Sequence, residues 1–420
     1  MKKKIILLLA LVLLSCSALF AQAEPAVQEV VLQELVAEAA KNNPQVQAAY
    51  QNWQSQVHKI TSVSSLPDPM ASYAYFGDSV ETRVGPQEEK YGVSQKVPFP
   101  GKLNLKAKSQ TKQAAVLQQK YQALKRSIIK QVKFVYNDIF WVEQAIQITE
   151  EEKSILEDLE RVVQRKYESN LAPQQDVLKV QVELSRLIDK LFLLRQNRKS
   201  LAVKMNILLD RPKDSEFGAF SVEPEEFKYE LDQLHQIAQG ASQKLLAANL
   251  EIERAEYERS LAKLDYLPDF TFGFDYTKIA DGTTTQTDDG QDAWMGKVMV
   301  NLPIWFNKLS AQAKEKQAKL EASKSSLENA KNEIVFEVED LYYKIMAYRD
   351  ILSLYQTALI PQTEQAFGAA RVAYESGVVD FLNWLDAERA LLQTRLAYYK
   401  TIVDYQKSIA YLESVVGKDL

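Results

Sequence analysis

The segment from Lys102 to Ser169 contains neither glycine nor proline and carries apolar side chains at spacings of three and four residues. This spacing places those side chains on one face of an α-helix. At 1.5 Å per residue, a helix of this length reaches about 100 Å, too long to fold back into one globule. The chain is therefore elongated, and the apolar face needs partner helices. The face consists of Leu117, Tyr121, Leu124, Ile128, Val132, Val135, Ile139, Val142 and Ile146.

A second helix is predicted from Lys308 to about Ile360. Its apolar side chains recur near the 3.5-residue period that makes helices coil around one another. They are Leu327, Ala330, Ile334, Val338, Leu341, Ile345, Tyr348, Leu352, Tyr355 and Leu359. Because coiled helices require such seams, helix packing is a better interpretation of them than a ligand groove.

Composition excludes several classes of protein. The net charge of −5, from 51 basic and 56 acidic residues, gives no basic field for nucleic acid. After the N-terminus, no stretch reaches the roughly 20 apolar residues of a membrane helix, which excludes an inner-membrane pump. Cys16, His58 and His235 are the chain's whole supply of cysteine and histidine, so we expect no disulfide, no metal site and no cofactor.

The N-terminus is typical of an exported protein. Three lysines precede the apolar run Ile5–Leu14, and Ala21-Gln22-Ala23 fits a signal-peptidase site, so residues 1–23 are predicted to be a signal peptide. Leu13-Leu14-Ser15-Cys16 resembles a lipobox and offers an alternative, in which Cys16 would be the lipidated N-terminus. Both alternatives place the protein outside the cytoplasm.

The two halves of the chain repeat the same motifs in the same order. Leu66-Pro67-Asp68 recurs 201 residues later as Leu267-Pro268-Asp269, and Pro98 matches Pro303. Tyr167-Glu168-Ser169-Asn170 recurs 207 residues later as Tyr374-Glu375-Ser376-Gly377. We therefore predict a tandem duplication, with one repeat at residues 24–220 and the other at residues 221–420. Each repeat comprises a helix, a strand hairpin, a long helix, a turn and a return helix.

The strands are expected after each LPD motif. Phe270–Thr277 pairs with about Trp294–Leu302 across the polar segment Ala280–Asp292, and Met70–Phe76 pairs with about Lys90–Val97 across Gly77–Glu89. Apolar and polar residues alternate along them, as in strands with one face toward lipid. On this interpretation Phe272, Phe274 and Val300 face lipid and Thr271 faces a lumen.

A sheet with one face buried in a globular domain is the alternative. Four strands cannot close a barrel, and open edges cannot face lipid. If the sheet is in a membrane, several copies of the chain must therefore contribute strands to one barrel.

The mature chain resembles the TolC-type outer membrane efflux factors. The motifs that carry the resemblance are Asn43-Pro44, both LPD turns, Val97-Pro98-Phe99-Pro100-Gly101-Lys102-Leu103, Met205-Asn206-Ile207-Leu208-Leu209, both Tyr-Glu-Ser turns and Ala410-Tyr411-Leu412-Glu413-Ser414-Val415-Val416-Gly417. The resemblance implies an α plus transmembrane β fold: a long coiled helical barrel continuous with a β-barrel that is completed by trimerisation, with four strands from each chain.

The resemblance also implies where the functional residues lie. The turns after the long helices, which contain Tyr167, Asn170, Tyr374 and Gly377, would dock a periplasmic adaptor. Family members carry a V-L-D-V-L-D-A pattern whose aspartates ring the channel entrance. Here the segment reads Phe381-Leu382-Asn383-Trp384-Leu385-Asp386-Ala387, so Asp386 keeps one acidic position and Asn383 replaces the other.

Asp176 matches the equivalent aspartate of the first repeat. Val379 stands where some members place an arginine latch. The alternative for Asp386 and Asp176 is ordinary charge on a solvated helix surface.

The function implied is a passive duct, not an enzyme, in the outer membrane of a Gram-negative bacterium and extending into the periplasm. It would be a homotrimer that works with a periplasmic adaptor (a membrane fusion protein) and an inner-membrane pump of the resistance-nodulation-division type. A type I protein secretion duct and a periplasmic structural coiled-coil protein are the alternatives. The Pro98–Lys102 turn resembles the heavy-metal branch, but the cargo, whether metal ion, drug or protein, stays open.

Overall fold

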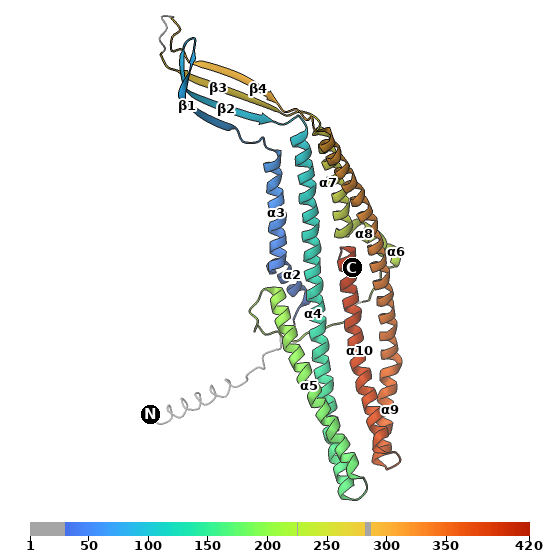
Figure 1. Ribbon diagram of the computed structural model, residues 1–420. Coiled ribbons are helices and arrows are strands. Elements are labelled where there is room, and N and C mark those ends of the chain that lie inside the picture. Colours follow the sequence, from blue (N-terminus) through green and yellow to red (C-terminus); the bar gives the residue numbers. More distant parts are fainter. Residues whose placement is uncertain (1–29, 225, 282–286) are drawn as a thin grey trace, which may run out of the picture. The chain divides into compact units, whose positions relative to one another are not determined.

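The computed structural model describes residues 30–224, 226–281 and 287–420, so the predicted signal peptide and Cys16 lie outside the described residues. Long helices and one four-stranded sheet make up the described chain (Figure 1). It divides into two compact units, and each combines segments from both halves of the sequence. Of the described residues, the tip unit comprises 30–37, 132–224 and 354–403, and the sheet unit comprises 38–131, 226–281, 287–353 and 404–420.

The helices follow the order that the repeat predicts. They are α2 (Leu32–Asn42), α3 (Pro44–Ser64), α4 (Lys102–Glu168), α5 (Gln174–Leu209), α6 (Leu231–Ala241), α7 (Gln243–Leu264), α8 (Phe306–Leu354), α9 (Ile360–Glu375) and α10 (Phe381–Val416), with a π-helical turn, η1 (Tyr355–Leu359), between α8 and α9. Asn43 caps α3, because its side chain accepts hydrogen bonds from Gln45 N (3.0 Å) and Val46 N (3.4 Å). None of the described helices combines the length and apolar character needed to cross a membrane.

The predicted helix from Lys102 is confirmed as α4. From Ile128 onward most of the predicted seam residues are buried, but nearer the N-terminus Ala114 and Val116 are buried while Leu117 is only half-buried. In that part of the sheet unit the helices stand in a single layer, so few side chains are covered on all sides. In α8 the predicted seam residues Leu327, Ala330, Ile334, Val338, Leu341, Ile345 and Leu352 are all buried.

The prediction that the second long helix ends near Ile360 is wrong. Pro361 lies at the start of α9, and the π-helical turn Tyr355–Leu359 precedes it, so the helical path continues to Glu375. Proline lacks an N–H and its ring clashes with the carbonyl four residues earlier in an α-helix. The wider π turn accommodates the proline without ending the helix.

The four strands form one antiparallel sheet in the order β1-β2-β3-β4. They are β1 (Met70–Thr82), β2 (Gly85–Val97), β3 (Phe270–Ile279) and β4 (Ala293–Val300). The predicted loop Gly77–Glu89 is wrong in extent, because both strands continue through most of it after a register shift between Tyr75 and Val80. The polar residues of Gly77–Glu89 suggested a loop. Strands are held together by backbone hydrogen bonds, however, so polar side chains do not prevent this segment from forming strands.

The strand register sorts the side chains onto two different faces. Pairings such as Tyr73 with Tyr91, Tyr91 with Tyr276 and Tyr276 with Trp294 place aromatic residues of all four strands on one face. The exposed apolar residues of this face are Tyr73, Tyr75, Tyr91, Val93, Phe272, Phe274, Tyr276, Trp294, Val298 and Val300. The opposite face carries Ser72, Lys90, Gly92, Thr271, Asp275 and Lys297, of which Asp275 pairs with Lys297 at 2.8 Å and Lys90 at 3.1 Å.

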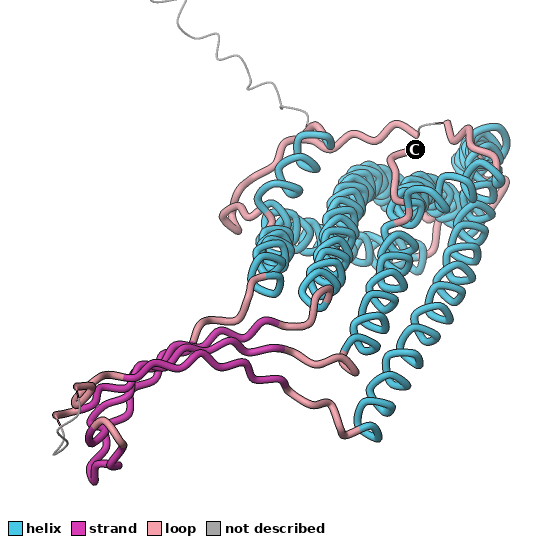
Figure 2. The backbone as a smooth tube through the Cα atoms, turned by 90° about the horizontal axis from the view of Figure 1, so that it is seen from above, coloured by secondary structure: helices cyan, strands magenta, loops and turns pink. Residues whose placement is uncertain are grey.

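Next to the sheet, helices α3, α4, α7 and α8 of the sheet unit stand in one row (Figures 1 and 2). Hydrogen bonds join α3 to α4 through Gln56 and Gln110 (3.0 Å), and ion pairs join α4 to α7 (Lys112–Glu253, 2.5 Å) and α7 to α8 (Glu258–Lys316, 3.1 Å). The helix order α3-α4-α7-α8 is therefore the strand order, because each strand connects directly to one helix. The sheet ends at β1 on one side and at β4 on the other, and neither edge strand has a second strand beside it within the described chain.

Candidate functional site

The predicted tips are two turns of the same geometry in the tip unit. Asn170 (φ 57°) and Gly377 (φ 78°) both adopt the left-handed conformation that ends many helices. In the first turn, Asn170 N donates to Tyr167 O (2.9 Å) and Leu171 N donates to Lys166 O (2.7 Å). In the second, Gly377 N donates to Tyr374 O (3.1 Å) and Val378 N donates to Ala373 O (2.9 Å). The predicted motifs thus occupy equivalent positions, and Asn170 and Gly377 have a local role as helix caps.

Each cap is followed by an exposed apolar side chain. In this type of cap the residue after the left-handed position usually packs against the last turn of its helix. Leu171 is instead 76% exposed and Val378 is 78% exposed. The sequence analysis did not single out either residue, although each directly follows a predicted tip residue.

The two equivalent tyrosines have different environments. Tyr167 is partly exposed, whereas Tyr374 is 5% exposed and packs against Trp384, with ring centroids 5.3 Å apart. Lys166 Nζ lies 4.2 Å from the centre of the Tyr374 ring and donates to the Tyr374 carbonyl (2.6 Å). Burial, and secondarily the carboxylate of Asp176, raise the pKa of Tyr374 to about 12. Tyr374 therefore anchors the second turn in the core of the tip unit.

Tyr374 belongs to a core that joins α4, α5, α9 and α10 within the tip unit. Its members are Ile148, Leu156, Leu159, Val163, Val177, Val180, Leu187, Tyr374, Phe381, Trp384, Leu385 and Leu392. Two buried polar atoms of this core, the Tyr374 hydroxyl and Trp384 Nε1, have no hydrogen-bond partner among the described residues. Such atoms destabilise a packed core unless the core gains a partner for them.

The predicted entrance residues lie at the start of α5 and α10. The 207-residue offset aligns Asp176 with Asn383, but the two residues make different interactions. Asn383 donates to Asp380 Oδ1 from both its backbone N (3.0 Å) and its side-chain Nδ2 (2.7 Å), so the Asp380 carboxylate caps the start of α10. Burial raises the pKa of Asp176, with Lys179 lowering it and the nearby Asp380 carboxylate raising it further. The structure thus brings Asp176 close to Asp380, a residue that the sequence analysis did not name.

Asp386 lies on the exposed face of α10. Its side chain is 73% exposed, and its Oδ1 lies 3.6 Å from Arg389 Nη1. Arg389 also binds Glu183 of α5. Within one chain Asp386 is a surface charge with a weak ion pair, and no interaction in the structure joins it to Asp176.

Sequence reasoning missed Glu388, the most perturbed acid of the tip. Its side chain is on the seam of α10, between Leu385 and Leu391, and it is 3% exposed. Burial raises its pKa to about 7, while Arg389 lowers it. The helical spacing of Phe381, Leu385 and Leu392 was the signal that could have identified it, because Glu388 falls on the same face. Among the described residues, no group of three or more histidine, cysteine, aspartate or glutamate side chains is arranged to hold a metal ion.

Comparison with known proteins finds similarity to one protein family in the second half of the chain. Residues 234–418 match the family model described as outer membrane efflux protein. The cobalt-zinc-cadmium resistance protein CzcC of Cupriavidus metallidurans is 35% identical over 66 residues. That match spans 16% of this chain and 16% of CzcC.

Solved structures resemble nearly the whole chain. The outer membrane protein VceC of Vibrio cholerae superposes with a TM-score of 0.77 at 16% identity, covering 92% of this chain and 96% of VceC. The outer-membrane channel OprN gives 0.79 at 15% identity, covering 92% and 89%. The open MtrE outer membrane channel of Neisseria gonorrhoeae gives 0.72 at 17% identity, covering 93% and 89%. The structure and these similarities confirm the predicted fold of a single copy of this chain, which is long helices with four antiparallel strands.

Proposed function

We propose that this chain, which carries an outer membrane efflux protein domain, is the outer-membrane duct of a Gram-negative export system. Several copies form a passive channel that leads from the periplasm to the exterior. The sheet lies in the outer membrane, and the helices extend into the periplasm. The family and the fold are those of channel proteins, which support a duct over an enzyme.

The exposed apolar face of the sheet is the observation that carries the proposal. Aromatic and aliphatic side chains from all four strands lie on it and are exposed, among them Tyr75, Phe274 and Trp294. In water each would forfeit the roughly 25 cal/mol per Å² that burial of apolar surface provides. Lipid acyl chains remove that cost, whereas the polar face, with Lys90, Asp275 and Lys297, is suited to a water-filled lumen.

The free edges support an assembly of copies. An open strand edge in lipid leaves backbone N–H and C=O groups without partners, and each costs several kcal/mol. Neither β1 nor β4 has a second neighbour in the described chain, so β4 of one copy has to pair with β1 of another. Resemblance to the efflux factors supports three copies, twelve strands and twelve tunnel helices. The two-repeat division, residues 24–220 and 221–420, stays part of this proposal.

The helices of the tip unit also present apolar surface for another copy. One side of α5 packs into the tip core, but other side chains of the same helix are exposed: Leu178, Val182, Ile188, Phe192 and Leu193. A helix that is apolar on two sides needs partners on both. A neighbouring copy in the tunnel supplies the second partner.

The tips are the proposed docking site for the periplasmic adaptor. Leu171 and Val378 are the exposed apolar side chains there, and Tyr167 and Asn170 accompany them in the first turn. The adaptor would connect the duct to an inner-membrane pump of the resistance-nodulation-division type. Asp386, three residues after Asn383 on α10, is the proposed acidic group of the entrance.

Divalent metal ions are the proposed cargo to test first. The 66-residue similarity to the cobalt-zinc-cadmium resistance protein favours the heavy-metal branch, which the Pro98–Lys102 turn also resembles. A type I protein secretion duct is the second candidate. Cobalt, zinc and cadmium tolerance, measured with and without the gene, separates the two, because a protein secretion duct leaves all three tolerances unchanged.

Membrane fractionation and a pair of arginine variants test the duct itself. The protein should sediment with outer membranes, need detergent for release and elute as a trimer. Phe274→Arg should block membrane insertion, because arginine at the bilayer midplane costs about 2–4 kcal/mol, and Thr271→Arg, on the lumen face, should be tolerated. Release of the native protein by salt alone would support the periplasmic structural protein instead, and equal effects of the two variants would refute the assignment of faces.

A further inference from the structure

A buried ion pair closes the junction between the two strand hairpins of the sheet unit. Lys102, at the start of α4, donates from Nζ to Asp269 Oδ1 (2.9 Å) and to the Leu267 carbonyl (3.0 Å). Phe99 N donates to the same Asp269 oxygen (3.0 Å). The Lys102 side chain is 7% exposed. The proline turn of the first repeat is thus bound to the LPD motif of the second, where β2 and β3 meet.

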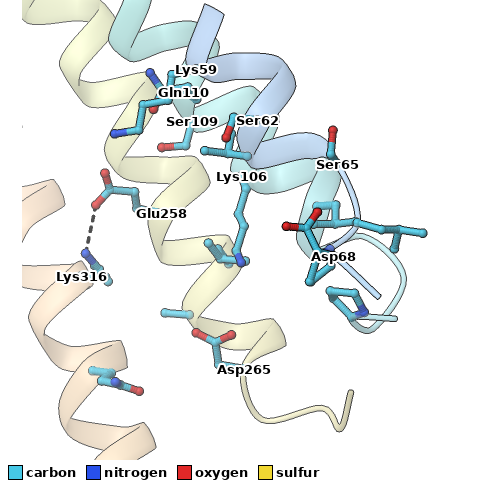
Figure 3. A pocket seen from close by; sticks show the side chains of 18 of the residues that line it. Lys59, Ser62, Ser65, Asp68, Lys106, Ser109, Gln110, Glu258, Asp265 and Lys316 are labelled. Carbon is cyan, nitrogen blue, oxygen red and sulfur yellow. Dashed lines mark hydrogen bonds and ion pairs between the residues drawn. The ribbon is translucent and has the colours of Figure 1, made fainter. Parts of the chain in front are cut away.

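The same two motifs occur once more, at the free edges of the sheet. By the repeat, Asp68 corresponds to Asp269, and Lys308 corresponds to Lys102 with one residue inserted in the turn. Asp68 precedes edge strand β1 and Lys308 follows edge strand β4, and both side chains are exposed. In Figure 3 Asp68 lies on the α3 side of an open pocket of 1060 Å³, while Lys316, across the pocket, pairs with Glu258.

Apolar neighbours of the two motifs show the same contrast. At the closed junction Pro98 is buried and Phe99 and Leu267 are half-buried. At the free edges Pro303, the counterpart of Pro98, is half-buried, whereas the counterparts of Phe99 and Leu267 and the other apolar residues around the second turn are exposed: Leu66, Leu302, Ile304, Trp305 and Phe306. Surface of this kind, contiguous with a free strand edge, is typical of an interface.

We infer that Lys308 of one copy binds Asp68 of the next copy, and that this contact between copies repeats the contact between Lys102 and Asp269 within the chain. The inference rests on the proposed function and specifies how its copies join. Lys308 Nζ takes the place of Lys102 Nζ and also donates to the Leu66 carbonyl, the counterpart of Leu267. Because this contact is heterologous, each copy both gives and receives it, and the copies form a ring if the rotation between them closes.

The repeat also fixes the register of the strands between copies. Val97 lies opposite Phe270 within the chain. The offsets of 205 and 201 residues convert this pair into Leu302 of one copy opposite Pro69 of the next. Two and four residues further along, Val300 lies opposite Ala71 and Val298 lies opposite Tyr73. These four residues all belong to the apolar face, so the register continues that face from copy to copy, whereas a slip of one residue would not.

Charge reversal tests the ion pair. In membranes extracted with a mild detergent, Asp68→Lys and Lys308→Asp should each lower the trimer fraction about tenfold, because like charges then meet at the junction. The double variant should restore it. Lys314→Asp, an exposed lysine two turns along α8, is the matched control and should leave the trimer intact. A native trimer that neither single reversal weakens overturns the inference and leaves the proposed duct standing, whereas absence of a native trimer overturns the duct as well.

Disulfide cross-linking tests the register without reversing a charge. Cys16 is the chain's one natural cysteine. Disulfides between introduced cysteines can therefore be detected with little background. Ala71→Cys with Val300→Cys should give covalent dimers and trimers on oxidation. Ala71→Cys with Val298→Cys, two residues out of register, should give about tenfold less. The reverse preference, or cross-links of equal yield, overturns the predicted register.

Discussion

Replacement of Glu388 by glutamine should stabilise the tip unit at alkaline pH and have little effect at acidic pH. Glutamine has the shape of the protonated acid and cannot ionise. Glu388 lies in an apolar seam, 3% exposed, and burial raises its pKa from the ordinary 4.5 to about 7. At about 1.4 kcal/mol per pH unit, this rise corresponds to about 3 kcal/mol between the two protonation states.

The sign follows from which state holds the proton more tightly. The folded pKa is above the unfolded value, so the folded tip retains the proton longer as pH rises. The contribution of the protonated acid is complete below about pH 4.5 and is lost as the pH rises through about 7. Glu388→Gln should therefore be near neutral at pH 4.5 and stabilising by about 3 kcal/mol at pH 8.5.

Hydrogen exchange of the α10 peptide that contains Glu388 measures this local stability directly, in the detergent-solubilised assembly. The opening free energies of the native protein and of Glu388→Gln, compared at both pH values, give the predicted difference. Asp386→Asn, in which the changed side chain is exposed, is the control and should show no pH-dependent difference. A Glu388→Gln effect of equal size at pH 4.5 and pH 8.5 would refute the argument, because it could not come from ionisation.

Three further changes test the tip. Gly377→Ala should lower the local opening free energy by about 1 kcal/mol by the same measurement, since its φ of 78° disfavours a Cβ while no atom lies within 4 Å of one. Tyr374→Phe should raise it by up to about 1 kcal/mol, because it removes a buried hydroxyl without a partner among the described residues. Asp386→Ala should relieve block by divalent or trivalent cations added on the periplasmic side of a planar bilayer, whereas Asp350→Ala, far along the same repeat, should not. A block identical to the native one in Asp386→Ala would identify the residue as ordinary surface charge.

The periodic spacing of apolar residues and the repeated motifs were enough to predict most helices, strands and tip turns. The absence of glycine and proline from residues 102–169 predicted α4 to within a residue, because nothing local opposes a helix there. Alternation predicted β3 and the apolar face around Phe274, because side chains on a strand have a period of two. The repeat predicted the two tips, and Asn170 and Gly377 occupy the same left-handed cap because a helix that ends sharply needs such a residue.

Periodicity and repeated motifs could not predict contacts between segments that are distant in sequence. The second long helix was predicted to end near Ile360, but a π turn, Tyr355–Leu359, leads directly into α9 at that point. Tyr374 and Tyr167 are equivalent in the repeat, but only Tyr374 is buried, by packing against Trp384 and Phe381. In the sequence, Glu388 is not distinguished from an acid on a helix surface. Only the packing of α4, α5, α9 and α10 buries it.

The sequence by itself determined most helices and strands and the two faces of the strands, because these depend on local spacing and on motifs that recur. The tertiary structure decided which copies of each motif meet within a chain: Lys102 with Asp269, while Asp68 and Lys308 stay exposed at the free edges. The physical reason is connectivity. One chain can join β2 to β3, but within the described residues its first and last strands each have only one neighbour.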